Sequence, residues 1–289
     1  MNVAILQASR ADAGILAPLI KALKADSRFT VSIIHGADQV RKPGWLIVLG
    51  DTLETLDAAR NAVSGLIPLA HIHGGDLTGN LDNKWRWAIT ALADLHFPCT
   101  QASAERLIKS GIEAWRVRVV GNLGIYAQSK AALKSKAAIC RKLGLNPKRE
   151  VVILIQHPES LHPELAGEQI AKTLELVRGY QVVAIYPNGE PGSDAIIEAL
   201  KACQWVNAFA NLPYLDFQAL LACADMVVGN SSCGLYEAPR YGVANLCIGS
   251  RQLHREEYHD EAIDGVKVIM DTLAATMIDD ILLTKRVAL

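Results

Sequence analysis

Short apolar runs recur along the chain, and each is followed by a turn and a stretch with helical periodicity. In the first half we expect strands at residues 3–6, 30–34, 46–49, 67–71, 95–98 and 117–120, with a first helix over residues 14–24. In the second half we expect strands at residues 151–155, 182–186, 226–228, 245–248 and 266–269. Nearly continuous apolar strands that alternate with helices predict parallel sheets covered on both faces.

One weak point separates the two sets of strands. The lysine-rich stretch 129–142 reads as helical and runs into GLNPKRE, where Gly144, Asn146 and Pro147 stop the helix. We therefore expect an N-terminal domain over residues 1–143 and a C-terminal domain over residues 144–270. Residues 271–289 are expected to form a helix that packs back on the first domain. The predicted fold is α/β, with two Rossmann-like doubly wound domains that face a cleft.

Composition narrows the class of protein. The 289 residues are 51% hydrophobic, and 29 Lys and Arg balance 30 Asp and Glu, which gives no charge field suited to nucleic acid or an acidic membrane. The start, MNVAILQASRADAG, is typical of a first strand and not of a signal peptide, and no apolar run is long enough to cross a bilayer. The six cysteines form no CxxC pair, which favours reduced thiols in the cytoplasm.

Polar residues flanked by glycine collect directly after the expected strands. They are Ser9-Arg10, Gly50-Asp51 and 71–76 in the first half, and His157-Pro158, Pro187-Asn188 and Asn230-Ser231-Ser232 in the second. Doubly wound sheets bind their ligands outside the carboxyl ends of the strands. The pattern therefore predicts an enzyme with an interdomain cleft.

The stretch LAHIHGGDLTGNLD carries the densest group of candidate residues. Alternation along an extended strand end places His71 and His73 on the same side, before a Gly-Gly turn and Asp76. A metal site is disfavoured because no HExxH motif and no cysteine partner accompany them. The alternatives are a plain polar turn and proton transfer near neutral pH, to which histidine is suited.

Two further turns in the first half carry charge. Asp51 at a strand end is suited to act as an acid or a base, whereas Glu54 is explained by the favourable dipole at a helix start. Arg10 lies at the mouth of the first strand-to-helix turn, where it suits an anionic phosphate. A surface ion pair with Asp12 is an equally good explanation for Arg10.

The sequence GNSSCGLYEAP predicts a strand followed by a helix that starts near Gly234. Ser231 and Ser232 can cap that helix, and its free N–H groups can bind a diphosphate. Glu237 can accept hydrogen bonds from both hydroxyls of a ribose, although plain helix capping also explains the motif. Neither GxGxxG after the first strand nor GxxxxGK[ST] occurs, which argues against a nicotinamide dehydrogenase and a P-loop ATPase.

Several stretches together resemble the UDP-N-acetylglucosamine 2-epimerases, especially the hydrolysing branch of the sialic and legionaminic acid pathways. The stretches are SRADAGILAPLIKAL, GDTLETLDAA, AHIHGGDLTGNLDNKWRWAITALADLHF, QHPES, YPNGEPGSDAII and GNSSCGLYEAPRYGVANLCIGSRQ, over residues 9 to about 252. The resemblance implies a GT-B fold, a homodimer, a UDP-sugar substrate and no metal or nicotinamide cofactor.

The resemblance also implies a mechanism in which UDP leaves the anomeric carbon while the C2 proton is removed. Water, in the hydrolysing branch, or UDP, in the non-hydrolysing branch, then adds to the glycal intermediate, with inverted C2. The implied catalytic residues are Asp51, His71, His73, Asp76 and Asp82. The implied UDP-binding residues are Arg10, His157, Asn188, Ser231, Ser232, Gly234, Glu237 and Arg251.

This sequence departs from the family pattern in several places. Thr52 stands where a GDR-type motif has arginine, and Trp87 and Ala91 replace a histidine and a lysine. The segment between Ile34 and Trp45 lacks a long insertion that forms one wall of the sugar site, where His35 is a possible substitute. Two alternatives therefore stay open. One is a GT-B glycosyltransferase or an epimerase of a different UDP-sugar, and the other is a catalytically impaired nucleotide-sugar-binding protein.

Overall fold

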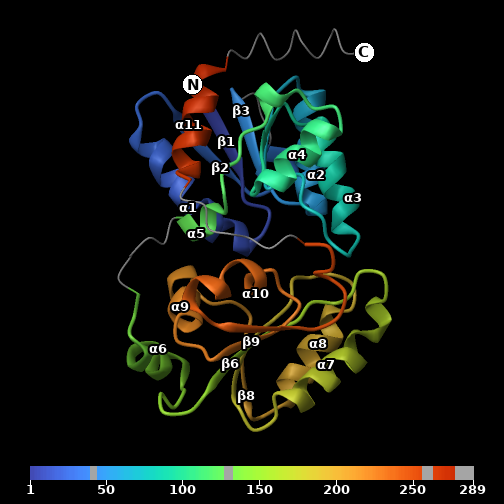
Figure 1. The fold of residues 1–289 in the computed structure, drawn as a ribbon, viewed down its shortest axis with the longest axis vertical. Helices are drawn as coiled ribbons and strands as arrows, with labels where there is room; N and C mark the ends of the chain where they lie inside the picture. Colours follow the sequence, from blue (N-terminus) through green and yellow to red (C-terminus); the bar gives the residue numbers. More distant parts are fainter. Residues whose placement is uncertain (40–43, 127–132, 256–262, 277–289) are drawn as a thin grey trace. The chain divides into compact units, whose positions relative to one another are not determined.

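The chain folds into two compact units (Figure 1). The computed structural model describes residues 1–39, 44–126, 133–255 and 263–276. The first unit consists of Met1–Leu77, Asp82–Ser129 and Tyr258–Leu289, and the second of Thr78–Leu81 and Lys130–Glu257. Each unit is built around one five-stranded parallel sheet, so the α/β prediction is confirmed.

The sheet of the first unit has the strand order β2-β1-β3-β4-β5. Its strands are β1 (Asn2–Leu6), β2 (Thr30–Ile34), β3 (Trp45–Leu49), β4 (Leu69–Ile72) and β5 (Leu95–Phe97), all parallel. All five residues of β3 and all four of β4 are buried, which is why these strands lack a polar face.

Helices cover both faces of this sheet. Alternate residues of β3 project to opposite sides, so Trp45 and Ile47 join one apolar cluster while Leu46 and Val48 join another. The first cluster includes residues of α1 (Arg10–Ala25), α5 (Leu123–Tyr126) and α11 (Gly265–Ala275), and the second includes residues of α2 (Leu53–Ser64) and α3 (Asp82–Leu92). Helix α4 (Gln101–Lys109) contributes Ala104 and Leu107 to a smaller cluster.

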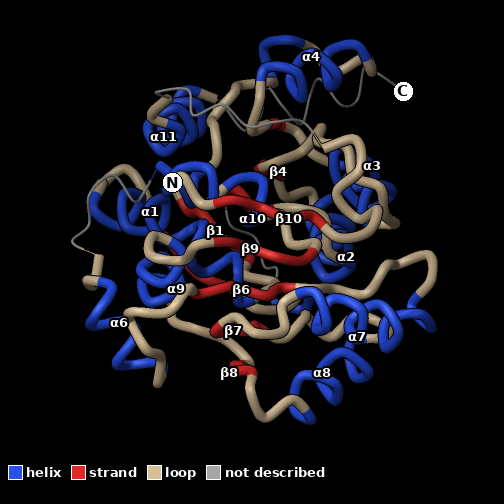
Figure 2. Tube along the Cα trace, turned by 60° about the horizontal axis from the view of Figure 1, so that its bottom comes forward, coloured by secondary structure: helices blue, strands red, loops and turns tan. Residues whose placement is uncertain are grey.

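The sheet of the second unit has the strand order β10-β9-β6-β7-β8, as Figure 2 shows. Its strands are β6 (Val151–Ile155), β7 (Gln181–Ile185), β8 (Val206–Phe209), β9 (Met226–Gly229) and β10 (Ala244–Cys247), again all parallel. Helices α7 (Ala166–Leu176) and α8 (Ser193–Ala202) cover one face, and α6 (Lys136–Leu143), α9 (Tyr214–Leu221) and α10 (Cys233–Tyr236) cover the other.

Each sheet reverses its strand order once, between β1 and β3 in the first unit and between β6 and β9 in the second. At such a reversal the turns that follow the two neighbouring strands lead away from each other. The crevice between these turns is where open α/β sheets bind ligands. At the second reversal Gly229 has a φ of 134°, and a Cβ atom there would lie 1.9 Å from the carbonyl oxygen of Ile155. Only glycine allows β6 and β9 to end so close together.

Two strand predictions were wrong and one strand was not predicted. Residues 117–120 form only a single parallel bridge, between His96 and Val117. Residues 266–269 lie in α11, because Asp264 caps the helix by accepting from the Lys267 amide and the apolar period continues through Ile269 to Leu273. The unpredicted strand is β8, whose short sequence VNAF is mostly half-buried.

The division between the units also differs from the expected boundary at residue 143. The chain divides at Ser129 and Lys130, because α6 packs with the second unit. Lys134 and Lys142 both form ion pairs with Asp216, the buried acidic residue in the first turn of α9. The expected helix over residues 271–289 overlaps the end of α11, and residues 277–289 lie outside the described part of the chain. None of the helices in the described ranges is long and apolar enough to cross a membrane.

Candidate functional site

Asp51 follows β3 at the strand reversal of the first sheet, and its partner is a buried arginine. Gly50, with a φ of 76°, turns the chain out of the strand, and Thr52 then caps α2 by accepting from the Thr55 amide at 3.2 Å. The Asp51 carboxylate accepts from the guanidinium of Arg86, which is 2% exposed. Thr52 therefore serves as a helix cap, and the cation at this turn comes from α3.

Arg86 also connects Asp51 to the loop after β4. Its Nη1 donates to the Asp76 carbonyl at 3.0 Å and to Asn83 Oδ1 at 3.4 Å. An arginine presents its donors in a rigid fork, so one guanidinium fixes the relative positions of several acceptors. The structure thus brings Asp51 and Asp76 together around one buried positive charge.

Asp76 is anchored from its other side by α4. Ser103 donates its hydroxyl to Asp76 Oδ1 at 2.8 Å, and Arg106 donates to the carbonyl of Gly75. Gly75 has a φ of 83°, and a Cβ atom there would lie 2.8 Å from the Ser103 carbonyl oxygen. The Gly75–Asp76 turn is therefore fixed against α4, and Asp76 is a buried, oriented carboxylate.

His71 is a fully buried residue of β4 and both its ring nitrogens have partners. Nε2 lies 2.8 Å from the Gly50 carbonyl oxygen, and Nδ1 lies 3.2 Å from Thr90 Oγ1. Because the Gly50 carbonyl only accepts, the bound imidazole carries its proton on Nε2. Burial, with a smaller contribution from the charge on His73, lowers the pKa of His71 to about 4. At neutral pH His71 is therefore uncharged, and its hydrogen bond to the Gly50 carbonyl fixes the residue that precedes Asp51.

The depressed pKa of His71 makes stability sensitive to acid. In the unfolded chain the imidazole takes up a proton as the pH falls through 6.5, whereas in the folded chain it does so only near 4. The contribution of His71 to stability is therefore fully present well above pH 6.5 and declines below it, by about 2 kcal/mol between pH 7 and pH 5. Urea unfolding at both pH values checks this, since His71→Gln keeps a donor for Gly50 but does not titrate. Equal losses for the wild type and the variant would contradict the prediction.

His73 and Asp82 lie at the two ends of the same loop. The strand ends at Ile72 and His73 has a φ of 62°, so strict alternation does not extend to His73. His73 is nevertheless close enough for its charge to affect the pKa of His71. Asp82 is the first residue of α3, one turn before Arg86. The exposed residue His35 donates its backbone N–H to Gln39, and its neighbours 40–43 lie outside the described residues.

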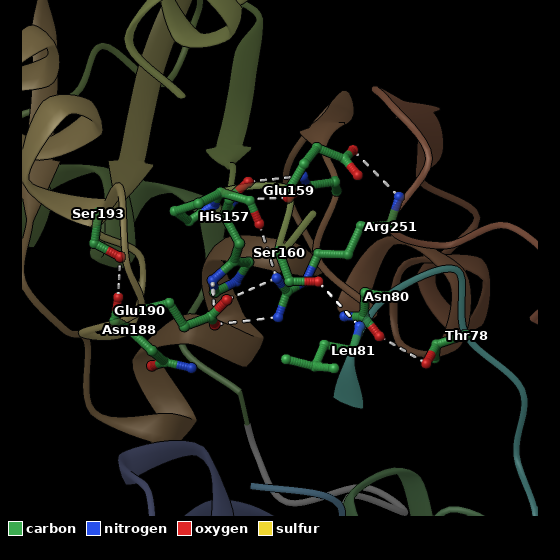
Figure 3. Close-up of polar contacts among 12 residues, drawn as sticks. Thr78, Asn80, Leu81, His157, Glu159, Ser160, Asn188, Glu190, Ser193 and Arg251 are labelled. Atoms are coloured by element: carbon green, nitrogen blue, oxygen red, sulfur yellow. Dashed lines mark hydrogen bonds and ion pairs between the residues drawn. The ribbon is translucent and has the colours of Figure 1, made fainter. Parts of the chain in front are cut away.

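The second unit presents a separate group of polar residues at its strand reversal (Figure 3). His157 follows β6 and Asn230 follows β9, and they exchange hydrogen bonds. The His157 amide donates to Asn230 Oδ1 at 2.6 Å, and Asn230 Nδ2 donates to the His157 carbonyl at 2.8 Å. Burial and the nearby Arg251 charge lower the pKa of His157 to about 3, so the imidazole is neutral at physiological pH.

The GNSSCG motif is less regular than its sequence suggests. Helix α10 has four residues and continues as a short 3-10 helix, so its dipole is small. Ser232 makes no side-chain cap, while Ser231 Oγ accepts from the Cys233 amide at 3.4 Å. A Cβ atom at Gly234 would lie 2.2 Å from Asn245 Oδ1, so packing against β10 explains that glycine.

Glu237 lies just beyond α10 and accepts from Gln218 Nε2 at 2.9 Å. Burial raises the pKa of its carboxyl group to about 7, although the hydrogen bond from Gln218 lowers it. Near neutral pH the Glu237 carboxyl group is therefore divided between its charged and neutral forms. Either form can accept a hydrogen bond from a ribose hydroxyl.

The remaining expected UDP-binding residues are Asn188, Arg251 and Arg10, of which Asn188 and Arg251 differ from each other in exposure and in partners. Asn188 is exposed, and its carbonyl accepts from the Ser193 hydroxyl. Arg251 is 8% exposed and forms a two-pronged ion pair with Glu190. Arg10 is the first residue of α1, and its side chain lies outside what the structure describes.

Arg86, Ser103 and Glu190 are among the residues of these sites that were not predicted. Arg86 carried a detectable signal, because a charged residue within WRWAIT falls on the same face of the helix as Ile89. An arginine on a buried helix face needs an acidic or carbonyl partner. Ser103 and Glu190 had no comparable signal, since serine and glutamate are common at helix starts and in turns.

Comparison with known proteins identifies the family. A family model of UDP-N-acetylglucosamine 2-epimerases matches residues 21–279. The chain belongs to this family. A UDP-N-acetylglucosamine 2-epimerase of Neisseria meningitidis serogroup B is 31% identical over 232 residues, 78% of this chain and 61% of that relative. A hydrolysing UDP-N,N'-diacetylbacillosamine 2-epimerase of Legionella pneumophila is 30% identical over 236 residues, 80% of this chain and 62% of that relative.

Solved epimerase structures share the fold. The N. meningitidis UDP-GlcNAc 2-epimerase bound to UDP-GlcNAc has a TM-score of 0.70 at 21% identity, covering 87% of this chain and 84% of that one. The Methanocaldococcus jannaschii UDP-GlcNAc 2-epimerase in complex with UDP-GlcNAc and UDP has a TM-score of 0.71 at 16% identity, covering 94% and 99%. The two parallel-sheet units are thus the two domains of a GT-B fold. This epimerase-family chain spans about six tenths of the length of the curated relatives it matches.

Proposed function

We propose that this chain is a hydrolysing UDP-N-acetylglucosamine 2-epimerase, which converts UDP-GlcNAc and water to ManNAc and UDP. The observation that carries the proposal is the Asp51 carboxylate, fixed by the buried Arg86 at the strand reversal of the first sheet. Ligands of doubly wound sheets bind at this position. Membership of the epimerase family supports the same reaction.

The reaction needs two proton transfers at C2, on opposite faces of the sugar. In the first step a base takes the C2 proton, a C1–C2 double bond forms, and the C1–O bond breaks with its electron pair leaving on UDP. In the second step the oxygen of water bonds to C1 and the water gives up a proton to a base, while an acid returns a proton to the other face of C2. General acid–base groups contribute roughly 10²–10⁴-fold each to such steps.

We assign these proton transfers to a subset of the first unit's polar residues. His71 is neutral with both nitrogens bonded, so we assign it the positioning of Gly50 and Asp51. Asp51, Asp76 and Asp82 supply carboxylates, and His73 supplies an imidazole. This revises the expected catalytic set by moving His71 from proton transfer to positioning.

We assign UDP binding mainly to the second unit. The residues are Arg10 from the first unit and His157, Asn188, Ser231, Ser232, Gly234, Glu237 and Arg251 from the second. The backbone N–H groups of Ser231 and Ser232, together with their hydroxyls, suit a diphosphate, and Glu237 suits a ribose. Gly234 supports this turn, because its amide donates to the Ser231 carbonyl at 3.3 Å and a side chain there would meet Asn245.

The reaction is tested with a panel of UDP-hexosamines in deuterated water. We expect release of UDP and of a 2-epimerised sugar that carries one carbon-bound deuterium at C2, because the returning proton comes from solvent-exchanged groups. Mass spectrometry of the product, after hydroxyl deuterium is washed out in ordinary water, measures this directly.

Other results with UDP-sugars would identify one of the alternative functions. Sugar transfer to an added acceptor without C2 inversion would identify a glycosyltransferase. Deuterium exchange with a UDP-sugar other than UDP-GlcNAc would identify an epimerase of a different substrate. Calorimetric binding of UDP with no turnover of any donor would identify a nucleotide-sugar-binding protein.

We also propose that the chain acts as a homodimer in the cytoplasm. The family resemblance supports the dimer, and six free cysteines support a reducing compartment. Light scattering on the purified chain decides between one copy and two.

A further inference from the structure

We propose that Glu190 competes with a nucleotide diphosphate for the anion-binding position at Arg251, so that the diphosphate must displace it. Glu190 would thereby limit the affinity for UDP and speed its release. The inference rests on the proposed binding of UDP by the second unit. It concerns a residue to which the expected binding set assigns no role.

The Arg251–Glu190 ion pair has the two-pronged geometry with which arginine also binds phosphate. Arg251 Nη1 donates to Glu190 Oε2 at 2.7 Å, and Nη2 donates to Oε1 at 3.1 Å (Figure 3). A guanidinium recognises carboxylate and phosphate oxygens through the same two-pronged arrangement. While Glu190 is bound, both Nη groups are engaged by the carboxylate.

Arg251 is held in place independently of Glu190. Its Nη1 also donates to the Pro158 carbonyl at 2.9 Å, and its backbone N–H donates to Glu159 Oε1 at 3.3 Å. Glu159 in turn accepts from the amide and hydroxyl of Ser250, at 2.7 and 2.6 Å. Arg251 can therefore keep its position when the Glu190 carboxylate moves away.

The backbone around Glu190 is fixed while its side chain can move. The Glu190 amide donates to the Asn188 carbonyl at 2.8 Å, and the Ser193 amide donates to the Glu190 carbonyl at 3.0 Å. Gly192 has a φ of 90° and packs against Pro163. The Glu190 side chain is 28% exposed, so rotation into solvent breaks none of the backbone contacts.

The His157 imidazole lies beside the same anion-binding position and offers it a second polar group. Its buried Nδ1 lies 3.7 Å from Glu190 Oε1 and has no hydrogen-bond partner within the described residues. That separation is too long for a hydrogen bond, so the carboxylate fills the position without satisfying the imidazole. A larger anion with more oxygens, such as a phosphate group, can reach both Arg251 and His157.

The test compares UDP binding by the wild type, Glu190→Gln and Glu168→Gln, using calorimetry. Glutamine keeps an acceptor for Arg251 but removes the competing charge, so we expect Glu190→Gln to lower the Kd for UDP about tenfold. Glu168 pairs with Lys172 on the exposed face of α7 in the same unit, and its replacement should leave the Kd unchanged. Unliganded melting temperatures check that all three proteins are folded.

The outcomes separate this inference from the proposed function. If the wild type binds UDP and Glu190→Gln binds it equally or more weakly, Glu190 positions Arg251 and does not compete with UDP, and the inference fails alone. Inorganic pyrophosphate serves as a second probe that needs no uridine site. If neither UDP nor pyrophosphate binds to either protein, both the inference and the proposed function are wrong.

Discussion

Replacing Asp51 by asparagine is expected to lower the turnover of a UDP-hexosamine by roughly 10³-fold, the size of effect seen when a general acid or base is lost. Asparagine has the same shape and can still accept from Arg86, so the change removes charge and proton-transfer capacity with little change in volume. Release of UDP and incorporation of deuterium at C2 should fall together, because elimination couples the two. Both are measured in one reaction in deuterated water.

The same variant separates catalysis from binding. The UDP-binding residues assigned above lie mainly in the second unit, so the Kd for UDP should stay within about twofold of the wild-type value. Asp57→Asn is the matched control, because Asp57 is an exposed residue of α2, which begins just after Asp51. Turnover by Asp51→Asn within threefold of the wild type would remove Asp51 from the catalytic set.

The strands were predictable from their short apolar and β-branched runs. Residues 30–34 and 151–155 were predicted with the bounds that the structure shows for β2 and β6. The error at residues 266–269 has a specific cause. The β-branched residues in VKVI are typical of a strand, but the helix cap at Asp264 and the apolar face through Leu273 outweigh that preference.

Only some residues of the candidate sites could be predicted from the sequence. Residues at strand ends were predictable, since the carboxyl ends of parallel strands meet at one edge of a sheet. Their partners were not, because the Asp51–Arg86 pair is 35 residues apart and the Glu190–Arg251 pair is 61 residues apart. Such pairs form only when the tertiary fold brings distant helices and turns together. The neutral state of His71 has the same origin, since its burial and its contact with Gly50 depend on the packed sheet.

Arg86→Met is expected to lower the free energy of unfolding of the first unit by about 3 kcal/mol, at the low end of the range for breaking a buried ion pair because Asp51 is 22% exposed. Methionine retains most of the aliphatic stem but leaves the Asp51 carboxylate and the Asp76 carbonyl without their donor. Urea unfolding followed by tryptophan fluorescence measures the loss, since Trp85 and Trp87 flank the substituted position on α3.

A double-variant comparison shows whether the loss comes from the ion pair. In Asp51→Asn/Arg86→Met no carboxylate is left without its cation, so the double variant should be less destabilised than the sum of the two single variants. Arg60→Met is the control for removing an arginine, because Arg60 is exposed on α2. Strict additivity would mean that Arg86 stabilises the fold through packing and the Asp76 carbonyl alone. Coupling of 1 kcal/mol or more, about the size seen for contacting residues, would show that the Asp51 carboxylate and its buried cation form one unit.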